Sequence, residues 1–480
     1  MKNLLLIPLG TFLLLSCNNS EKKDNALLDE RISKIENGLE SNLQIQYGDS
    51  LIKSVYNLED RMRELKIPGL SIAVLNDGEI EWARGYGIAD SLEDRKVDTE
   101  TLFQAGSISK PIAATRALQL SEQGLLDLDE NINTYLTSWK LPDNEFTRSE
   151  KVTTRRILNH TAGLSVWGFP GYARGETIPS IPDILDGKGN TDSVRVFKEP
   201  GESWRYSGGG YTIMQQLIAD LENESFDVIL RNEVLNPLKM QFSTYENPLP
   251  EKYHSIAASG YREDGTIVDG QWHIYPEMAA AGLWTTPSEL LLWAQEVQKI
   301  LMTQEAGLLD VETINEMLTP NEDSQGLGPY VLDLTFGHGG ADEGFRAELL
   351  VWKETANAVA VMVNSDQGST IIRELLLSVV REYGLPEYAP RKRIFKRQSH
   401  DSLSRFTGKY DFNDSGQARI VVRDDGLEVT GDLFSDVIFL WPEADSTFFN
   451  KETGTRYHFI LKDNKAVGLK FSRLEGEKID

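Results

Sequence analysis

Cysteine is almost absent from this chain, which has a single cysteine, Cys17, among its 480 residues. One cysteine cannot form an intramolecular disulfide or a thiolate metal site. The six histidines are too scattered along the sequence to indicate a metal site. The patterns Gly-x-Ser-x-Gly and His-Glu-x-x-His are also missing, which weakens the hydrolase classes that depend on them. We therefore expect neither a metal ion nor another cofactor.

Basic residues are scarce relative to acidic ones: 49 lysines and arginines stand against 74 aspartates and glutamates, for a net charge of −25. This balance argues against nucleic acid or anionic lipid headgroups as partners. Hydrophobic residues make up 40% of the chain, which is enough for a sizeable core. At this length we expect two folded units.

Long apolar segments are lacking as well. The run from Leu4 to Leu15 spans twelve residues, which is too short to cross a bilayer as a helix and suits a signal peptide. It leads into Leu14-Leu15-Ser16-Cys17, which resembles a bacterial lipobox. We expect an exported lipoprotein that is anchored to the membrane through a lipid on Cys17 and faces the periplasm or the cell exterior. An ordinary signal peptide with a chance cysteine is the alternative.

Three serines precede a lysine by three positions: Ser20, Ser50 and Ser107. Ser20 lies in the polar stretch after the signal segment, where no rigid scaffold holds it. Ser50 starts a segment, residues 51–65, whose apolar residues recur at helical spacing, so its hydroxyl is most simply a helix cap. Ser107 starts an apolar segment that predicts a buried helix, with Lys110 one turn along on the same face. A helix N-terminus stabilises negative charge, but a capping serine has the same pattern, so these residues alone leave catalysis and capping open.

Three further segments follow the Ser107 motif along the chain. They are "ILNHTAGL" (157–164), "EPGESWRYSGGGYTIMQQLI" (199–218) and "FGHGGADEGFRAELL" (336–350). Together with segments 67–87 and 279–294, they make the sequence resemble the serine hydrolases of the class C β-lactamase and penicillin-binding family, from about residue 50 to about residue 385. The resemblance implies an α+β fold of the β-lactamase/transpeptidase type, with an antiparallel sheet flanked by helices plus an all-helical region.

The resemblance also implies roles for the motif residues. Ser107 is the nucleophile that forms an acyl-enzyme, and Lys110 is its cationic neighbour. Tyr206 is the general base, which requires that the charge of Lys110 lowers the pKa of the tyrosine. His338 occupies the place of the third catalytic element. The backbone N–H groups of Ser107 and Ala341 form the oxyanion hole.

Each of the aromatic and imidazole side chains also has a simpler interpretation. Standing alone, Tyr206 is more readily a packed aromatic residue, and His338 a structural histidine. His160 in "NHTAG" looks like a general base, but the resemblance makes it structural, with its ring bonded to nearby backbone.

Two residues depart from the family pattern. Gly208 replaces an asparagine that would contact the lysine and the substrate amide, and His338 replaces a lysine that would face a substrate carboxylate. Both changes leave acyl transfer intact but disfavour β-lactams and other substrates with a carboxylate beside the scissile bond. Gly208 and Gly340, which ends the third motif, are expected at the substrate. Trp167 either lines the wall of an apolar acyl pocket or packs with its loop on the surface of its own domain. Arg346 restores the missing charge if it points inward.

Beyond about residue 390, short strands alternate with turns, which predicts a small antiparallel barrel or sandwich. This region resembles the lipocalin-like C-terminal domain of some relatives of the family. We favour a structural cap over a ligand-binding barrel, because a small barrel is normally filled by its own side chains. The expected order is a signal segment (1–17), a flexible tether (18–48), a serine hydrolase domain (49–388), a basic linker (389–404) and the small all-β domain (405–480).

These features predict an exported, lipid-anchored serine hydrolase that acts through an acyl-enzyme on a small-molecule or peptide substrate with an ester or amide bond. We expect a monomer with no nucleic-acid partner. The alternative is a penicillin-binding or sensor protein of the same fold that becomes acylated but scarcely turns over, because deacylation depends on how a water is held.

Overall fold

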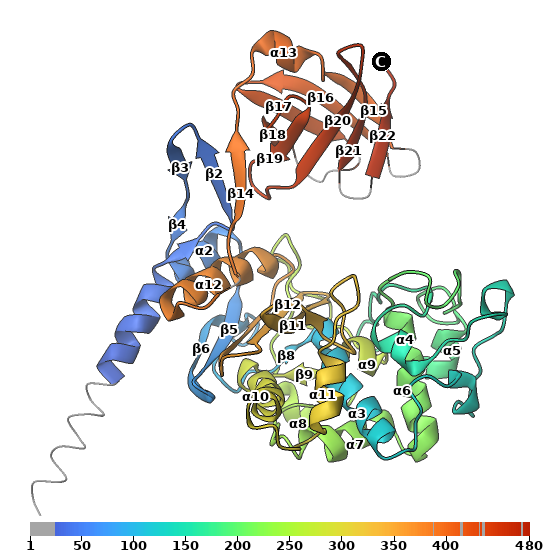
Figure 1. Cartoon of the computed structure of the whole chain (residues 1–480). Coiled ribbons are helices and arrows are strands. Elements are labelled where there is room, and N and C mark those ends of the chain that lie inside the picture. The colour runs from blue at the N-terminus through green and yellow to red at the C-terminus, as the bar shows by residue number, and fades with distance from the viewer. Residues whose placement is uncertain (1–24, 387, 413–415, 432, 434–436, 472–473) are drawn as a thin grey trace, which may run out of the picture. The chain divides into compact units, whose positions relative to one another are not determined.

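The computed structural model describes residues 25–480 except 387, 413–415, 432, 434–436 and 472–473 (Figure 1). The lipidation candidate Cys17 lies outside the described residues. The chain divides into two compact units. The central unit is Leu58–Leu376, and the terminal unit combines the described residues before Leu58 with Leu377–Asp480. No helix within these described ranges is long and apolar enough to cross a membrane.

The central unit is built on a seven-stranded antiparallel sheet with the order β10-β11-β12-β13-β5-β6-β7. Asp77 and Gly78 have positive φ and connect β5 to β6, so the predicted hairpin is confirmed. Every residue of β13 is buried, because this strand lies between other strands in the middle of the sheet. The strands are β5 (Gly69–Asn76), β6 (Glu79–Asp90), β7 (Arg95–Lys96), β10 (Tyr330–Val331), β11 (Thr335–Asp342), β12 (Phe345–Trp352) and β13 (Ala358–Val363).

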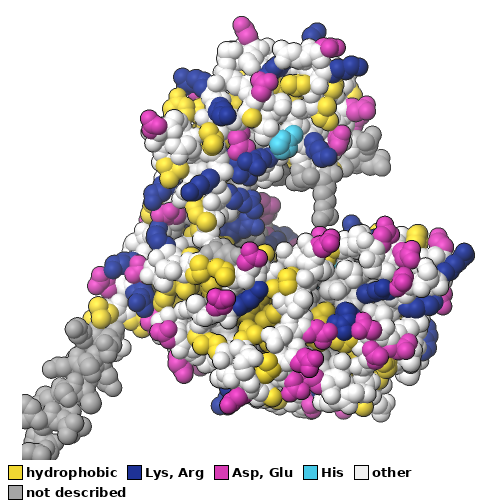
Figure 2. Space-filling model, viewed as in Figure 1, with side chains coloured by type: hydrophobic (Ala, Val, Ile, Leu, Met, Phe, Trp, Pro, Cys, Tyr) yellow, Lys and Arg dark blue, Asp and Glu magenta, His cyan; other side chains and the backbone are white. Residues whose placement is uncertain are grey.

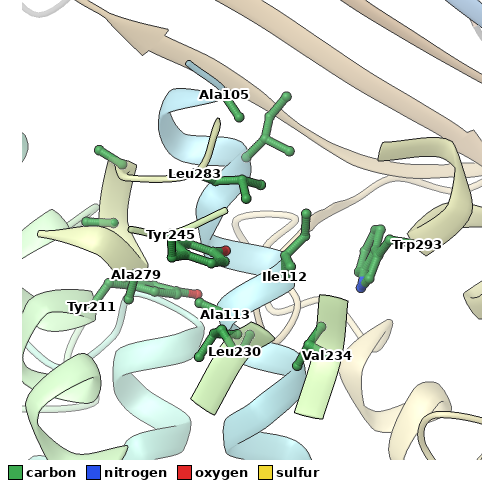
Figure 3. Packing of buried hydrophobic residues seen from close by; sticks show 14 of the residues in the cluster. Ala105, Ile112, Ala113, Tyr211, Leu230, Val234, Tyr245, Ala279, Leu283 and Trp293 are labelled. Atoms are coloured by element: carbon green, nitrogen blue, oxygen red, sulfur yellow. The ribbon is translucent and has the colours of Figure 1, made fainter. Parts of the chain in front are cut away.

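Helix α3 (Ser109–Glu122) runs through the core of the central unit, and all its residues from Ser109 to Leu120 are buried. The buried helix predicted from the sequence is therefore confirmed. Tyr245 lies on one side of α3 and Trp293 on the other (Figure 3). Both rings also bind the helix, since the Tyr245 hydroxyl donates to the Ser109 carbonyl and the Trp293 indole donates to the Thr115 hydroxyl.

The other helices of the chain are mostly short. Longer ones include α10, which packs on β5 and β13 of the sheet. The α-helices are α2 (Leu58–Glu64), α4 (Thr154–Leu158), α5 (Ile181–Leu185), α6 (Gly208–Glu222), α7 (Phe226–Leu230), α8 (Glu251–His254), α9 (Met278–Ala281), α10 (Pro287–Thr303), α11 (Val311–Met317), α12 (Gly368–Tyr383) and α13 (His400–Ser404). Short connecting elements are β8 (Phe103–Gln104), η1 (Gly106–Ile108), η2 (Ile132–Thr134), η3 (Glu145–Thr147), η4 (Arg231–Leu235) and β9 (Trp284–Thr285).

The helix predicted over residues 51–65 is wrong in its first half. Two short strands, β3 (Ser50–Ile52) and β4 (Val55–Tyr56), precede α2, which begins only at Leu58. The first pairs with β2 (Leu43–Tyr47) and the second with β1 (Leu39–Glu40). Strand pairing with residues earlier in the chain has overridden the helical spacing.

Unlike the tether and linker that the sequence predicts, residues 25–56 and 391–395 form regular structure in the terminal unit. Residues 25–36 form a helix, and β14 (Arg391–Phe395) pairs in parallel with β2. Ile45 and Phe395 of this sheet pack against Phe449, whereas Leu51, Ile52 and Ile394 of the same sheet are exposed. The basic side chains of β14 are mostly exposed, and blue side chains gather over this strand in Figure 2.

The rest of the terminal unit is a closed barrel of eight strands, β15 to β22. Neighbouring strands are antiparallel, and β15 pairs with both β16 and β22, which closes the barrel and excludes the sandwich alternative. Phe406, Tyr410, Phe448 and Phe459 are buried together inside it. The strands are β15 (Gly408–Asp411), β16 (Gln417–Arg423), β17 (Gly426–Gly431), β18 (Ile438–Pro442), β19 (Thr447–Asn450), β20 (Arg456–Lys462), β21 (Lys465–Phe471) and β22 (Leu474–Lys478).

Candidate active site

Ser107 sits in η1, the single turn that leads into α3, and this turn lies directly against strand β11. Two glycines permit the close approach. A Cβ atom on Gly106, which has a φ of +51°, would lie 2.5 Å from the Ala341 nitrogen, and one on Gly340 would lie 1.9 Å from the Ala105 oxygen. Any side chain at either position would push the two elements apart. The structure therefore brings the backbone of Ser107 next to that of Ala341, the two residues expected to form the oxyanion hole.

Lys110 extends from the first turn of α3 into the protein, and only 2% of it is exposed. Its Nζ atom donates to Ser107 Oγ at 3.0 Å and to the Ala280 carbonyl oxygen at 2.7 Å. Burial disfavours the charged ammonium and lowers the pKa of Lys110 to about 7, against an opposing effect of the Asp342 carboxyl. A large part of the Lys110 population is therefore neutral at physiological pH.

Tyr206 precedes α6, whose N-cap is Ser207, and the Tyr206 hydroxyl is hydrogen-bonded to Ser107. Lys110 Nζ lies 4.9 Å from the centroid of the Tyr206 ring. Burial raises the pKa of Tyr206 far above its usual value, and the hydrogen bond with Ser107 offsets this only in part. The role of general base, expected for Tyr206 from the family resemblance, requires a lowered pKa. Burial raises the pKa of Tyr206 instead, and desolvation outweighs any influence of Lys110. The hydroxyl of Tyr206 stays protonated at neutral pH.

His338 lies on β11 and is 3% exposed. Its ring stacks on Tyr330 at a centroid distance of 4.9 Å and lies 6.3 Å from the Tyr206 ring. Burial and the neighbouring Lys110 lower the pKa of His338 to about 3, so the ring is neutral at pH 7. With Nδ1 2.6 Å from the Gly339 carbonyl oxygen, Nδ1 donates and Nε2 is left as a buried acceptor with no partner among the described residues.

The substrate-binding candidates Gly208 and Trp167 lie beside Tyr206. The Trp167 ring is 5.5 Å from that of Tyr206, and Trp167 is 65% exposed. A Cβ atom on Gly208 would lie 2.9 Å from the ring of Phe169. An asparagine at position 208 would therefore collide with Phe169, which explains why glycine stands there.

Arg346 does not present a free charge. Its Nη1 atom forms an ion pair with Asp366 at 3.0 Å and donates to the carbonyl oxygens of Asp342 and Phe345. The positive charge of Arg346 is thus already matched within the protein.

Two buried carboxyl groups, Asp342 and Glu277, were not found by sequence analysis, and Asp342 interacts electrostatically with both Lys110 and Glu277. Asp342, directly after the third motif, accepts a hydrogen bond from the backbone of Gly106, and burial raises its pKa well above the usual range. Glu277 precedes α9, is fully buried, and neither of its carboxyl oxygens has a partner in the described chain. Burial raises the pKa of Glu277 to about 7. In the sequence, each is an acidic residue next to an apolar or glycine-rich run. This pattern does not distinguish a buried carboxyl group from an exposed one.

His160 lies behind Tyr206, with the two ring centroids 4.2 Å apart. Its Nδ1 accepts the backbone N–H of Ser207 at 3.2 Å, and burial together with Lys110 holds its pKa well below the usual value. This neutral ring supports the start of α6. No group of three or more His, Cys, Asp or Glu side chains that could hold a metal ion occurs in the part of the chain that the structure describes.

Known proteins resemble this chain in sequence and in fold. The family model described as Beta-lactamase matches residues 56–377. Penicillin-binding protein 4* of Bacillus subtilis (strain 168) is 21% identical over 429 residues, which cover 82% of this chain and 91% of that protein. Putative penicillin-binding protein PbpX of the same organism is 23% identical over 318 residues, covering 65% of this chain and 74% of that protein.

Two solved structures share the fold. The octameric penicillin-binding protein homologue from Pyrococcus abyssi matches with a TM-score of 0.60 and 21% identity, covering 88% of this chain and 98% of that one. FmtA from Staphylococcus aureus matches with a TM-score of 0.54 and 16% identity, covering 69% of this chain and 89% of that one.

Proposed function

Since this chain belongs to the Beta-lactamase family, as its motifs predict, we propose that it hydrolyses an ester or amide through an acyl-enzyme on Ser107. The observation that carries the proposal is the pair of contacts at Ser107. Lys110 Nζ lies 3.0 Å from the serine Oγ, and the Tyr206 hydroxyl is hydrogen-bonded to the same residue. A serine alcohol becomes a nucleophile when an adjacent base takes its proton.

Lys110 is the base in this proposal. Its pKa of about 7 makes the neutral amine available, whereas the raised pKa of Tyr206 keeps that hydroxyl protonated. The Ser107 proton passes to Lys110 Nζ as Oγ bonds to the substrate carbonyl carbon. The resulting negative oxygen is held by the backbone N–H groups of Ser107 and Ala341.

Tyr206 is the proton donor to the leaving group. It gives its hydroxyl proton to the departing oxygen or nitrogen as the bond to the carbonyl carbon breaks, and the Lys110 ammonium restores the proton to Tyr206. In deacylation a water gives a proton to Lys110 Nζ as its oxygen bonds to the carbonyl carbon. Tyr206 protonates Ser107 Oγ as the acyl–serine bond breaks, and the Lys110 ammonium again restores the proton to Tyr206. This assignment replaces the tyrosinate base of the sequence argument, and it keeps all three residues essential.

We further propose that the preferred substrate has no carboxylate beside the scissile bond. His338 is neutral, the charge of Arg346 is matched by Asp366, and position 208 has no side-chain amide. No free cation among these residues faces such a carboxylate, so β-lactams gain little here.

The test is a comparison of kcat/KM for a short-chain ester and a chromogenic cephalosporin. We expect the ester to be preferred, Ser107→Ala to abolish turnover of both, and Tyr206→Phe to lower it by about two or more orders of magnitude. His338→Lys should shift the ratio toward the cephalosporin. A wild type that prefers the cephalosporin would refute the substrate assignment. Labelling of Ser107 by a fluorophosphonate without turnover of any ester or amide would instead indicate the binding or sensor protein.

For location, we propose that Cys17 is lipidated and anchors the exported chain to a membrane. The lipobox-like sequence supports this proposal. Cys17→Ser should release the protein from the membrane fraction or leave an uncleaved precursor. A wild-type protein that is processed and yet remains in the soluble fraction would contradict it.

A further inference from the structure

Val166, one residue before Trp167, has an unusual backbone. Its φ is +62°, and it is the one β-branched residue among the non-glycine positions with positive φ in the described chain. The left-handed region is strained for a branched side chain, and such a conformation persists only where its surroundings impose it.

The start of helix α6 imposes this conformation through three consecutive carbonyl groups, those of Ser165–Trp167. The Ser207 hydroxyl donates to the first at 2.8 Å, the Gly209 N–H to the second at 3.1 Å and the Gly208 N–H to the third at 3.0 Å. The first N–H groups of a helix have no partner within the helix, so these carbonyls satisfy donors that would otherwise be unpaired. The Val166 side chain also packs against the central core.

This arrangement fixes Trp167 beside the reacting groups. The indole lies against Tyr206, but most of Trp167 is exposed. An apolar group of a ligand could therefore pack on the free part of the ring. The next residue, Gly168, borders open space, because a Cβ atom there would meet nothing within 4 Å. The backbone that carries the indole is held by the carbonyl contacts with α6 and by the packing of the Val166 side chain against the central core.

We propose that Trp167 is a specificity-determining wall on which an extended apolar group of the substrate packs, and that Val166 is the positioning residue that fixes this wall beside Tyr206. The inference rests on the proposed serine hydrolase and narrows its substrates to esters or amides with an alkyl or aryl group of several carbons. Each buried methylene contributes about 0.8 kcal/mol, so a few methylene groups against the indole raise kcat/KM by more than tenfold.

The test uses two ester series, one with acyl chains from acetyl to octanoyl on a common p-nitrophenyl leaving group, and one of acetate esters of alcohols from methyl to octyl. Trp167→Ala should lower kcat/KM for the long members of one series by about tenfold and leave its shortest member within about twofold. Val166→Gly removes the side chain that packs on the core and lets the backbone adopt other conformations, so it should have the same effect although glycine tolerates the positive φ. The double variant should lose no more than Trp167→Ala alone, because Val166 acts through the indole. Gly168→Ala, a change in the same segment that meets open space, is the matched control and should behave as wild type.

Additive losses in the double variant, or losses that are equal for long and short esters in both series, would overturn the inference. Absence of all turnover in the wild type would refute the proposed hydrolase instead, and the positioning role is then tested without activity. In protein labelled with 5-fluorotryptophan, Trp167→Phe identifies the Trp167 resonance in the 19F spectrum. That resonance should shift or broaden in Val166→Gly and stay unchanged in Gly168→Ala. An unchanged resonance in Val166→Gly would show that this residue does not position the indole.

Discussion

The buried position of its Nζ atom determines the protonation state of Lys110. An exposed lysine is protonated at neutral pH, but the buried Nζ of Lys110 has a pKa of about 7 and still reaches Ser107. Burial favours the neutral form of Tyr206 and of His338 in the same site, so it raises the pKa of the tyrosine and lowers the pKa of the histidine. Tyr206 and His338 are therefore neutral at pH 7, and part of the Lys110 population is neutral, as the proposed base requires.

We predict that kcat/KM for an uncharged ester depends on a group with an apparent pKa near that of Lys110. Because the base must be neutral, activity should be half-maximal at about pH 7, level off above about pH 8 and fall about tenfold for each pH unit below about pH 6. The measurement is a pH profile from 5.5 to 8.5, with the rate of Ser107→Ala subtracted. A profile that is flat over this range, or that falls above pH 7, would exclude Lys110 as the base.

Glu277 leads to a prediction about stability. Its pKa is about 7 in the folded protein and 4.5 for the free side chain, so the folded state binds the proton more tightly than the unfolded state. The stability that this group contributes is complete below pH 4.5 and is lost as the pH rises to about 7, by about 3 kcal/mol. Glu277→Gln should therefore raise the free energy of unfolding at pH 8 and change it little at pH 4.5.

Chemical denaturation at the two pH values provides this measurement. Glu322→Gln, a substitution of an exposed glutamate, is the control and should shift neither value. If Glu277→Gln destabilises the protein equally at pH 8 and pH 4.5, the buried carboxyl has a stabilising partner and the assigned cause is wrong.

Sequence analysis located Ser107, Lys110, Tyr206 and His338 because each belongs to a short motif that keeps its order along the chain. It did not find Glu277, because a motif records neighbours in sequence and not the apolar surroundings that the fold assembles. The direction of the Tyr206 pKa was missed for the same reason: proximity of a lysine was inferred, but the extent of burial was not.

At the scale of elements, the site depends on how closely β11 approaches η1. Gly340 lies where the strand passes the Ala105 carbonyl, and the adjacent Ala341 carries the second oxyanion amide of the proposed mechanism. This makes Gly340 a spacer between two backbones, a role that differs from the direct substrate contact expected from its motif.

We predict that Gly340→Ala lowers kcat/KM by about a hundredfold or more, because a Cβ atom 1.9 Å from the Ala105 oxygen must displace β11 and its amide from Ser107. Gly339→Ala is the matched control one residue away. Its Cβ atom would come no closer than 3.1 Å to the end of the flexible Glu348 side chain, so its activity should stay within a few fold of wild type. Equal effects of the two substitutions would show that strand spacing is not what matters.

Elements with local signals could be predicted, and elements made by distant pairing could not. Helix α3 and the β5–β6 hairpin follow from apolar spacing and from the Asn76-Asp77-Gly78 turn. Strand β2, near residue 45, pairs with β14, near residue 393. The sequence of neither segment indicates which strand it will pair with. The first half of the predicted helix over residues 51–65 failed for the same reason.

At the scale of the whole molecule, the barrel of the terminal unit is filled by its own side chains. The aromatic cluster in its interior includes Phe406 and Phe448, both fully buried with rings 5.0 Å apart. This packing favours a structural role for the barrel over ligand binding.

We predict that Phe448→Ala lowers the stability of the terminal unit by roughly 3–5 kcal/mol, because the lost ring leaves a cavity in a packed interior. Val467→Ala, at an exposed position on β21, should change stability by less than about 0.5 kcal/mol. Both stabilities are measured by denaturant unfolding of the full chain. Limited proteolysis at each denaturant concentration reports whether residues 405–480 are unfolded. A Phe448→Ala protein as stable as Val467→Ala would show that the interior is not tightly packed.

The order of strands in the central sheet also has a consequence for biosynthesis. Strands β5 to β7 are translated before Ser107, whereas β10 to β13, which complete the same sheet, come from the far end of the central unit. In the proposed mechanism, a growing polypeptide therefore contains Ser107 long before β11 and Ala341 exist to supply the second oxyanion amide. Pairing over such a separation is a late and slow step of folding. If the proposed mechanism holds, the nascent chain stays inactive until almost the whole central unit has been made.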